Sequence, residues 1–167
     1  SLIWNPASTA AAKPELRDAF TRAIPRGDIL RTAAGDIGSL VSAPILRSHP
    51  GYNSKLQVKP FNLDAAAQGF EQAGFKQQHI GSPRTLGPDK PIFLRIVRLS
   101  GRQELLEKMI SDSLASLGIN SQFDDPNTTG VTFDAALASV FIPWTSQDLR
   151  SVAHSDDVTD KIGRAHV

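Results

Sequence analysis

The sequence predicts an α/β fold in which a mixed β-sheet is flanked by helices. Three observations favour this fold: a strand–helix–strand unit over residues 92–123, an amphipathic helix over residues 15–24, and a further apolar strand over residues 133–140. The chain has 167 residues, of which 40% are hydrophobic and 21% are charged, as is ordinary for one soluble domain with a core. We therefore expect residues 1–167 to form a single domain.

The first elements follow from local patterns. Residues 2–5 are expected to form a short strand, followed by a loop that extends through Pro14. A helix over residues 15–24 is predicted because apolar residues recur there at the spacing of one helical face: Leu16, Ala19, Phe20, Ala23 and Ile24. Pro25 should end this helix, since it lacks an N–H group and collides with the preceding turn.

Two more helices are indicated by their capping residues. Asp28 is expected to cap a short helix that ends at Gly35. Residues 38–60 are rich in Gly, Pro and Ser and are predicted to form a long surface loop, a kind of segment that is often functional. Asn62 should cap the next helix, and Gly74 should end it in a left-handed conformation.

The strand–helix–strand unit is the clearest pattern. Residues 92–99 form a mostly apolar strand, and Ser100 with Gln103 has the spacing of a capping box. A second strand is expected over residues 119–123, and a unit of this length favours parallel pairing. The helix between the strands carries a stripe of apolar residues: Leu106, Ile110, Leu114 and Leu117.

The remaining segments alternate between turns and one buried strand. Residues 77–91 and residues 124–130 are expected to be polar connections. Between residues 133 and 140 the chain is apolar enough for a buried strand. From Asp148 onward the sequence is polar, and we expect it to end in a helix.

Composition excludes several classes of function. With no cysteine there is no disulfide, no Cys-based metal site and no Cys nucleophile. The net charge of +1, with one Tyr and two Trp, gives no case for a nucleic-acid partner. The longest apolar run, Ala135 to Trp144, is interrupted by Ser139 and Pro143, so no segment should span a membrane. The chain opens directly in a predicted strand without a signal peptide, which indicates a fragment of a longer protein.

No catalytic or metal-binding pattern emerges. G-x-S-x-G, Walker and H-E-x-x-H motifs do not occur, so we expect neither an enzyme nor a cofactor. One group of side chains near the C-terminus resembles a loose metal cluster: His154, Asp156, Asp157 and Asp160. The same residues are typical of a polar helix start, because Ser155 and Asp156 are good caps, so we expect no metal here. The acidic run that begins at Asp124 lacks the spacing of a calcium loop and predicts a turn.

Four segments resemble one family in the expected order. Residues 17–29 resemble the Arg-x-Ala-x-x-x-Ala-Ile-Asp-Arg-x-x-Ile segment of the family 5 solute-binding proteins. Residues 61–75 are similar to the family's Tyr-Asp-Pro-Glu helix with its Ala-Gly-Tyr end, residues 114–119 to its Leu-x-x-x-Gly-Ile, and residues 133–137 to its Tyr-Asp strand. Asn5 falls where the family has a strand that ends in Phe-Asn. These proteins are extracytoplasmic receptors of ABC importers for oligopeptides, dipeptides and nickel chelates.

The resemblance implies a periplasmic-binding-protein-like lobe. Family members have two lobes that close around a ligand, and this chain resembles most of the second lobe, which would hold half of a binding site. The resemblance also implies an ABC permease as partner, an extracytoplasmic location, and a parent lipoprotein anchored by lipid. The fragment itself is expected to be a monomer.

Two positions depart from the family pattern. Pro25 stands where the family commonly has Asp, a capping position, so only local structure should change. Pro143 stands where many peptide receptors have an Asp that holds the α-ammonium group of the peptide. A proline cannot pair with an ammonium group, so the α-amine is either not recognised or is held by another residue.

Candidate ligand contacts lie in two segments. One follows the last predicted strand, because ligands of open α/β folds sit beyond the carboxyl ends of strands: Phe141, Ile142, Trp144 and Thr145. The other is the long loop, with Arg47, His49 and Tyr52. The alternatives are a tryptophan packed under a surface loop and a solvated loop without function.

The expected function is that of the substrate-binding component of an ABC importer for oligopeptides, contributing one side of the cleft. A first alternative is a receptor for a non-peptide solute such as a nickel chelate or a sugar. A small hydrolase or transferase domain of unrelated α/β fold is a second alternative. A receptor-derived domain used only for protein–protein contact is a third.

Overall fold

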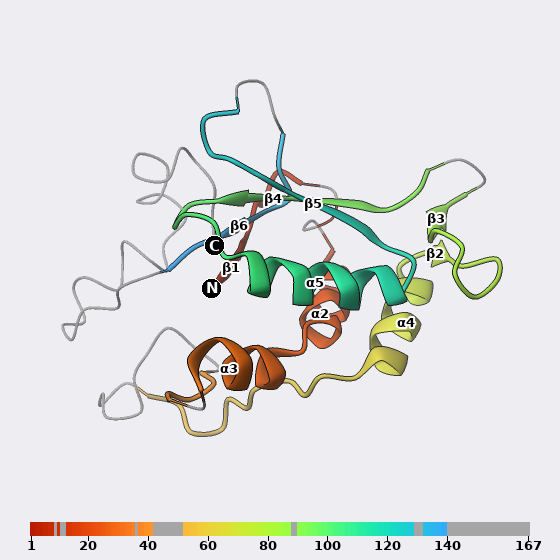
Figure 1. The fold of residues 1–167 in the computed structure, drawn as a ribbon. Coiled ribbons are helices and arrows are strands. Elements are labelled where there is room, and N and C mark those ends of the chain that lie inside the picture. Colours follow the sequence, from red (N-terminus) through yellow and green to blue (C-terminus); the bar gives the residue numbers. More distant parts are fainter. Residues whose placement is uncertain are drawn as a thin grey trace.

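The computed structural model describes residues 1–8, 10, 13–35, 37–41, 52–87, 90–128 and 132–139. Its centre is a four-stranded sheet in the order β1-β6-β4-β5 (Figure 1). The strands are β1 (Leu2–Trp4), β4 (Phe93–Arg98), β5 (Asn120–Asp124) and β6 (Ala135–Leu137). Strand β4 is parallel to both of its neighbours, whereas β1 is antiparallel to β6, so the predicted mixed sheet is confirmed.

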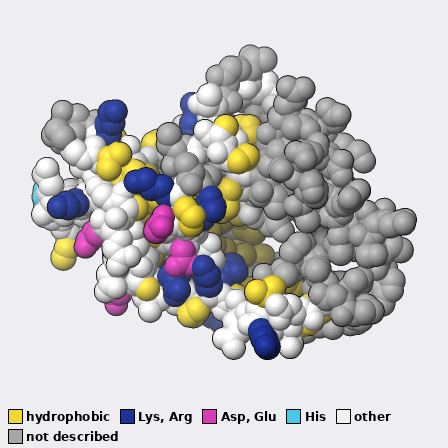
Figure 2. Space-filling view, turned by 180° about the vertical axis from the view of Figure 1, so that it is seen from behind, with side chains coloured by type: hydrophobic (Ala, Val, Ile, Leu, Met, Phe, Trp, Pro, Cys, Tyr) yellow, Lys and Arg dark blue, Asp and Glu magenta, His cyan; other side chains and the backbone are white. Residues whose placement is uncertain are grey.

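The helices lie on one side of this sheet (Figure 1). They are α2 (Pro14–Ala23), α3 (Arg26–Ala34), α4 (Leu63–Gln72) and α5 (Glu104–Ser116). A small hairpin of β2 (Phe75–Lys76) and β3 (Thr85–Leu86) stands apart from the main sheet. Figure 2 shows the molecule from behind, where Lys and Arg side chains are interspersed with Asp, Glu and hydrophobic side chains.

The core forms where α2 and α4 meet the sheet. The predicted stripe of α2 is buried, and Phe20 is inaccessible to solvent at its centre. The ring of Phe20 lies 5.1 Å from that of Trp4 on β1 and 4.9 Å from that of Phe70 on α4, between ring centroids. These aromatic contacts, together with the burial of Leu94 and Ile96 on β4, join the helical layer to the sheet.

Helices α2 and α4 approach closely because α4 has a glycine at the contact. A Cβ atom built on Gly69 would lie 2.9 Å from the Cβ of Ala19, which is closer than side-chain carbons come in folded proteins. The glycine costs helix propensity, about 1 kcal/mol relative to alanine. Its position therefore indicates that close helix packing outweighs that cost.

Replacing Gly69 by Ala should lower the free energy of unfolding by about 1 kcal/mol, because overpacking of about 2 kcal/mol exceeds the gain in helix propensity. Urea denaturation of the variant measures the change. Adding Ala19→Gly removes the overlap, so the double variant should be less destabilised than the sum of the two single variants. Strict additivity of the two changes would contradict this account of the contact.

Several local signals proved accurate. The side chain of Asn62 accepts a hydrogen bond from the backbone N–H of Ala65 at 2.8 Å, which confirms it as the cap of α4. Gly74 has a φ angle of 96° after that helix, and Gly35 ends α3 in the left-handed region. Strands β4 and β5 pair in parallel with α5 between them in sequence, as predicted.

Three boundary predictions were wrong. Pro14 is the first residue of α2 rather than part of the preceding loop, since proline is tolerated where a helix begins. Helix α3 begins at Arg26 with Pro25 as its N-cap, so Asp28 lies in the first turn and pairs with Arg31. The predicted strand over residues 133–140 is a strand only at Ala135–Leu137 among the described residues.

The predicted capping box of α5 was also wrong. Gln103 is the N-cap and makes no side-chain cap hydrogen bond. Instead its backbone N–H donates to Oε1 of Glu107 at 3.0 Å. The hydroxyl of Ser100 accepts a hydrogen bond from the backbone N–H of Ser139, so it joins the segments that follow β4 and β6 instead of capping the helix.

The hairpin of β2 and β3 was missed, because its second strand lies in the segment predicted as a polar connection. Arg84 holds it in place: this buried side chain donates from Nε to the carbonyl of Leu117 at 2.9 Å and from Nη1 to that of Phe75 at 3.2 Å. Strands of two residues show no periodicity, and a buried arginine has no local signal. The described parts of the predicted long loop, residues 38–41 and 52–60, contain neither helix nor strand, and the C-terminal helix expected after Asp148 lies outside the described residues.

Candidate functional site

The carboxyl ends of the parallel strands meet at one edge of the sheet. Arg98, the last residue of β4, is in register with Leu137, the last residue of β6. The antiparallel strand β1 starts at the same edge, because Leu2 also pairs with Leu137. Helix α5 begins at this edge as well (Figure 1). In open α/β sheets the carboxyl edge is where ligands bind.

A cavity of about 430 Å³ lies at this edge, within the size range of small-molecule sites. Its walls come from the strand ends, from the first half of α5, from α3 and its junction with α2, and from the segment after α3. The residues that line it are Ser1, Leu2, Trp4, Thr21, Ile24, Arg26, Ile29, Leu30, Ser39, Leu40, Val41, Leu106, Ile110 and Leu137.

Arg26 is the charged side chain among these residues. Its Nη2 donates a hydrogen bond to the carbonyl of Lys59 at 2.5 Å. Burial lowers the pKa of the Arg26 guanidinium, which nevertheless remains charged at neutral pH. The hydroxyl of Thr21 donates to the carbonyl of Arg17 in its own helix. The cavity therefore combines an apolar wall with one guanidinium.

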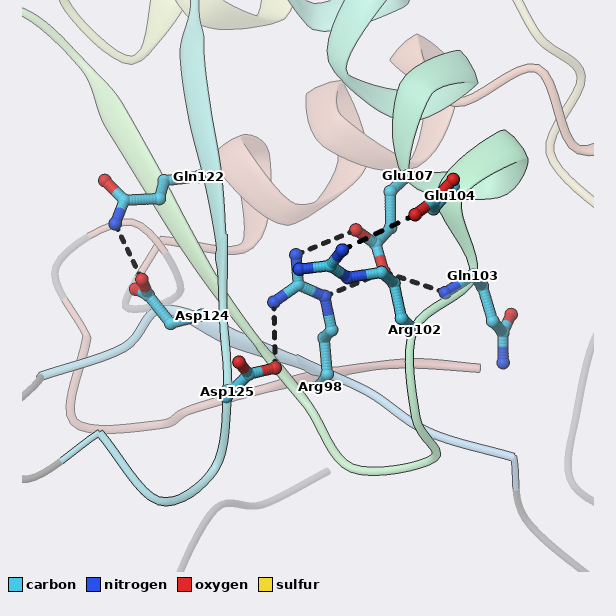
Figure 3. A network of polar contacts seen from close by, with 8 residues as sticks. All are labelled: Arg98, Arg102, Gln103, Glu104, Glu107, Gln122, Asp124 and Asp125. Atoms are coloured by element: carbon cyan, nitrogen blue, oxygen red, sulfur yellow. Dashed lines mark hydrogen bonds and ion pairs between the residues drawn. The ribbon is translucent and has the colours of Figure 1, made fainter.

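An ion-pair network fixes the start of α5 against the strand ends beside the cavity (Figure 3). Arg98 makes a two-fold contact with Glu107, from Nε to Oε1 at 2.8 Å and from Nη2 to Oε2 at 2.9 Å. Both side chains are about nine-tenths buried. Nη1 of Arg98 also reaches Asp125 after β5 at 3.1 Å. The network thus joins β4, α5 and the end of β5.

The charges in this network shift each other's pKa values in the expected directions. Hydrogen bonds from the Arg98 guanidinium hold the pKa of the Glu107 carboxyl below its ordinary value. In turn, the hydrogen bonds to Glu107 raise the pKa of Arg98. Both groups are therefore ionised at neutral pH, and the pair serves to position the start of α5 next to the Leu106 wall of the cavity.

The sequence-predicted contacts are placed only in small part. Tyr52 is half-buried and does not belong to the residues that line the cavity. The remaining predicted contacts lie outside the described residues: Arg47, His49, Phe141, Ile142, Trp144 and Thr145.

The two acidic segments that the sequence offered as possible metal sites differ in whether the structure describes them. Among the described residues no group of three or more His, Asp or Glu side chains is arranged to hold a metal ion. The cluster around His154 lies outside those residues. Asp124 pairs with Arg95 and Asp125 with Arg98, and Thr128 N–H donates to the carbonyl of Asp125 at 3.0 Å, which confirms the predicted turn.

Sequence patterns missed most of the cavity wall. Ile24, Leu106 and Ile110 were assigned to the core, because an apolar residue at the end of a helical stripe has the same pattern whether it faces the core or a cavity. The signal that could have identified them is position, since all lie beside the carboxyl ends of the predicted parallel strands. Arg26 had no such signal.

Among the described residues, no helix has the length and apolar character needed to cross a membrane.

Comparison with solved structures shows the same fold in larger proteins. The chain is similar to the oligopeptide-binding protein AppA of Bacillus subtilis, solved with a nonapeptide, at 18% identity and a TM-score of 0.75 over 98% of this chain and 35% of that one. NikA of Brucella suis, solved with Fe(III)-EDTA, gives 16% identity and a TM-score of 0.79 over 97% of this chain and 35% of that one. A periplasmic oligopeptide-binding protein of Thermotoga maritima, solved with mannohexaose, gives 21% identity and a TM-score of 0.77 over 99% and 35%.

The chain thus spans about a third of the length of these structures. None of the curated proteins matches it. The family model of the bacterial extracellular solute-binding proteins, family 5 middle, matches residues 1–153. The resemblance found in the sequence is confirmed: this chain belongs to the family 5 bacterial extracellular solute-binding proteins.

Proposed function

We propose that this chain is the second lobe of the substrate-binding component of an ABC importer and provides one side of a cleft for oligopeptides. The observation that carries the proposal is the cavity at the carboxyl edge of the sheet, with walls from β1, β6, α3 and α5. Membership of the family supports the receptor role. The whole receptor would lie outside the cytoplasm, anchored by lipid, and would work with ABC permease subunits in the membrane.

An extended ligand suits the geometry of this edge. In the described sheet β1 is at one end of the strand order, with β6 on its inner side. Leu2 and Trp4 of β1 line the cavity. An edge strand can hydrogen-bond an extended peptide through its main chain, while a neighbouring pocket receives a side chain. Phe141, Ile142, Trp144 and Thr145, which follow β6 in the sequence, stay predicted contacts, as do Arg47, His49 and Tyr52.

Native mass spectrometry of the full-length gene product, purified gently, tests the proposal. A ladder of co-purified peptide masses is the expected result. A single non-peptide mass would keep the receptor role and replace the peptide by a chelate, a sugar or another solute. Absence of any bound solute, together with no binding in a screen of peptides, would contradict the proposed function.

The isolated chain should bind peptides at least about tenfold more weakly than the full-length product, because half of the cleft and the closing motion are missing. Isothermal titration of both proteins with the same peptide measures the difference. Submicromolar affinity of the isolated chain would contradict the half-site interpretation.

A further inference from the structure

We infer that the cavity receives the last residue of a peptide that ends in a bulky apolar amino acid, and that Arg26 pairs with the terminal carboxylate of that peptide. The inference rests on the proposed function, because it specifies which end of an oligopeptide this lobe recognises and which side chain it prefers.

The cavity wall favours an apolar group. Ten of the fourteen lining residues are apolar, and they come from both the sheet and the helices. Leu137 and Ile110 are themselves buried, so this part of the wall is continuous with the core. A polar side chain placed here would lose its hydration without gaining partners, whereas a Leu, Ile or Phe side chain would be stabilised by the burial of its apolar surface.

Arg26 is a cation in this wall without a matching anion among the described residues. Its guanidinium donates a hydrogen bond to a neutral acceptor, the carbonyl of Lys59. The ion pairs of the described residues do not include it. A guanidinium carries five N–H donors and binds a carboxylate through two parallel hydrogen bonds, so a ligand carboxylate would satisfy donors that the described residues leave unpaired.

The surroundings of Arg26 add to the positive charge. Asp18 is shared by Arg22, at 2.9 Å, and by the ammonium group of Lys59. Hydrogen bonds from these two cations lower the pKa of the Asp18 carboxyl, so it is fully used by them. Asp18 already pairs with two cations, so the charge of Arg26 adds to a positive junction and favours an anionic ligand group over an ammonium group.

The start of α3 also favours an anionic ligand group. Arg26 is its first residue, and the N-cap Pro25 makes no side-chain hydrogen bond to the first turn. A Cβ built on Gly27 meets nothing within 4 Å, so space remains beside this turn. Asp28 in the same turn pairs with Arg31. The positive end of a helix dipole strengthens the attraction that Arg26 exerts on a carboxylate.

A set of three peptides separates the two parts of the inference. All share one sequence and differ only at the C-terminus: Leu with a free carboxylate, Leu with an amide, and Ser with a free carboxylate. Titrated into the full-length gene product, the first should bind at least about tenfold more tightly than either of the others, a difference of about 1.4 kcal/mol.

Two pairs of variants locate the effect. Arg26→Gln should weaken the binding of the peptide with a free C-terminal Leu by about tenfold or more. The binding of the amide peptide should stay unchanged, and this result would show that the rest of the site is intact. Arg31→Gln is the matched control, since Arg31 lies on the same helix, pairs with Asp28 and does not line the cavity. Leu106→Trp should weaken the binding of the peptides that end in Leu, because Leu106 lines the cavity. Leu105→Trp is the control and should leave their binding unchanged, because Leu105 is exposed and does not line the cavity.

The outcomes separate this inference from the proposed function. If the full-length product binds peptides but acid and amide bind equally, or Arg26→Gln has no effect, the inference is overturned and the receptor role stands. Tight binding of octanoic acid without binding of any of the three peptides would overturn the peptide as occupant. If the product binds no solute at all, the inference and the proposed function are both overturned.

Discussion

Replacing Gly118 by Ala is expected to destabilise the chain by about 3 kcal/mol, the sum of backbone strain and a steric overlap. Gly118 follows α5 with a φ angle of 72°, in the left-handed region that residues with a side chain rarely adopt. A Cβ there would lie 2.4 Å from the carbonyl oxygen of Ser82 and 2.8 Å from Nε2 of Gln77. The carbonyl of Gly118 also accepts the backbone N–H of Arg84 at 2.8 Å, so the new side chain would push the hairpin away from α5.

A matched glycine separates the two causes. Gly101 has a similar φ angle of 78°, but a Cβ built there meets nothing within 4 Å. Gly101→Ala should therefore lower the free energy of unfolding by about 1 kcal/mol, from strain alone. Urea denaturation of both variants measures the difference. Equal losses at the two positions would show that the contact with the hairpin contributes nothing.

Replacing Glu107 by Gln is expected to lower the free energy of unfolding by about 3 kcal/mol, because it leaves the Arg98 guanidinium nine-tenths buried without its main partner. The loss should fall at the low end of the range for a broken buried pair, since Asp125 still faces Arg98. Glu104→Gln is the control: Glu104 lies in the same turn, is exposed, and approaches Arg102 at 3.5 Å, so its loss should be within about 0.5 kcal/mol.

The same pair predicts the response to acid. The pKa of Glu107 is lower in the folded chain than in the unfolded chain, so its contribution is fully present above the unfolded value of about 4.3. It is lost as the pH falls from there through the folded value. Asp18, whose pKa is also lowered, contributes in the same direction. The Glu107→Gln variant should therefore lose less stability than the parent chain between neutral pH and pH 3, and an unchanged acid dependence would contradict the assignment.

Local sequence signals settled much of the helical layer. The stripe around Phe20, the cap at Asn62 and the left-handed glycine at position 74 each depend on residues within a few positions of one another. Each of these signals has a local physical cause: the periodicity of the helix, hydrogen bonding to its first turn, and the freedom of glycine at positive φ. The parallel pairing of β4 and β5 also followed, because a short connection through one helix allows little else.

Local sequence signals could not predict the partners of the buried charged side chains. Nothing in the local sequence distinguishes Glu107 from an exposed helix residue, yet it is buried because Arg98 at the end of β4 and the N–H of Gln103 both meet its carboxylate. The same is true of Arg84, whose acceptors are backbone carbonyls on other elements. A charged side chain is buried only where partners from several segments converge, and no single segment specifies that convergence.

The sequence by itself determined the α/β class, the family and most of the helices, and it predicted a site at the carboxyl edge of the sheet. Only the tertiary structure decided that β6 lies between β1 and β4, in a pairing that joins Leu2 to Leu137. It also decided that Arg26 and Leu106 share one cavity. The reason is that local conformation depends on neighbours in the chain, whereas a cavity and the charged group that lines it are brought together by the packing of segments far apart in sequence.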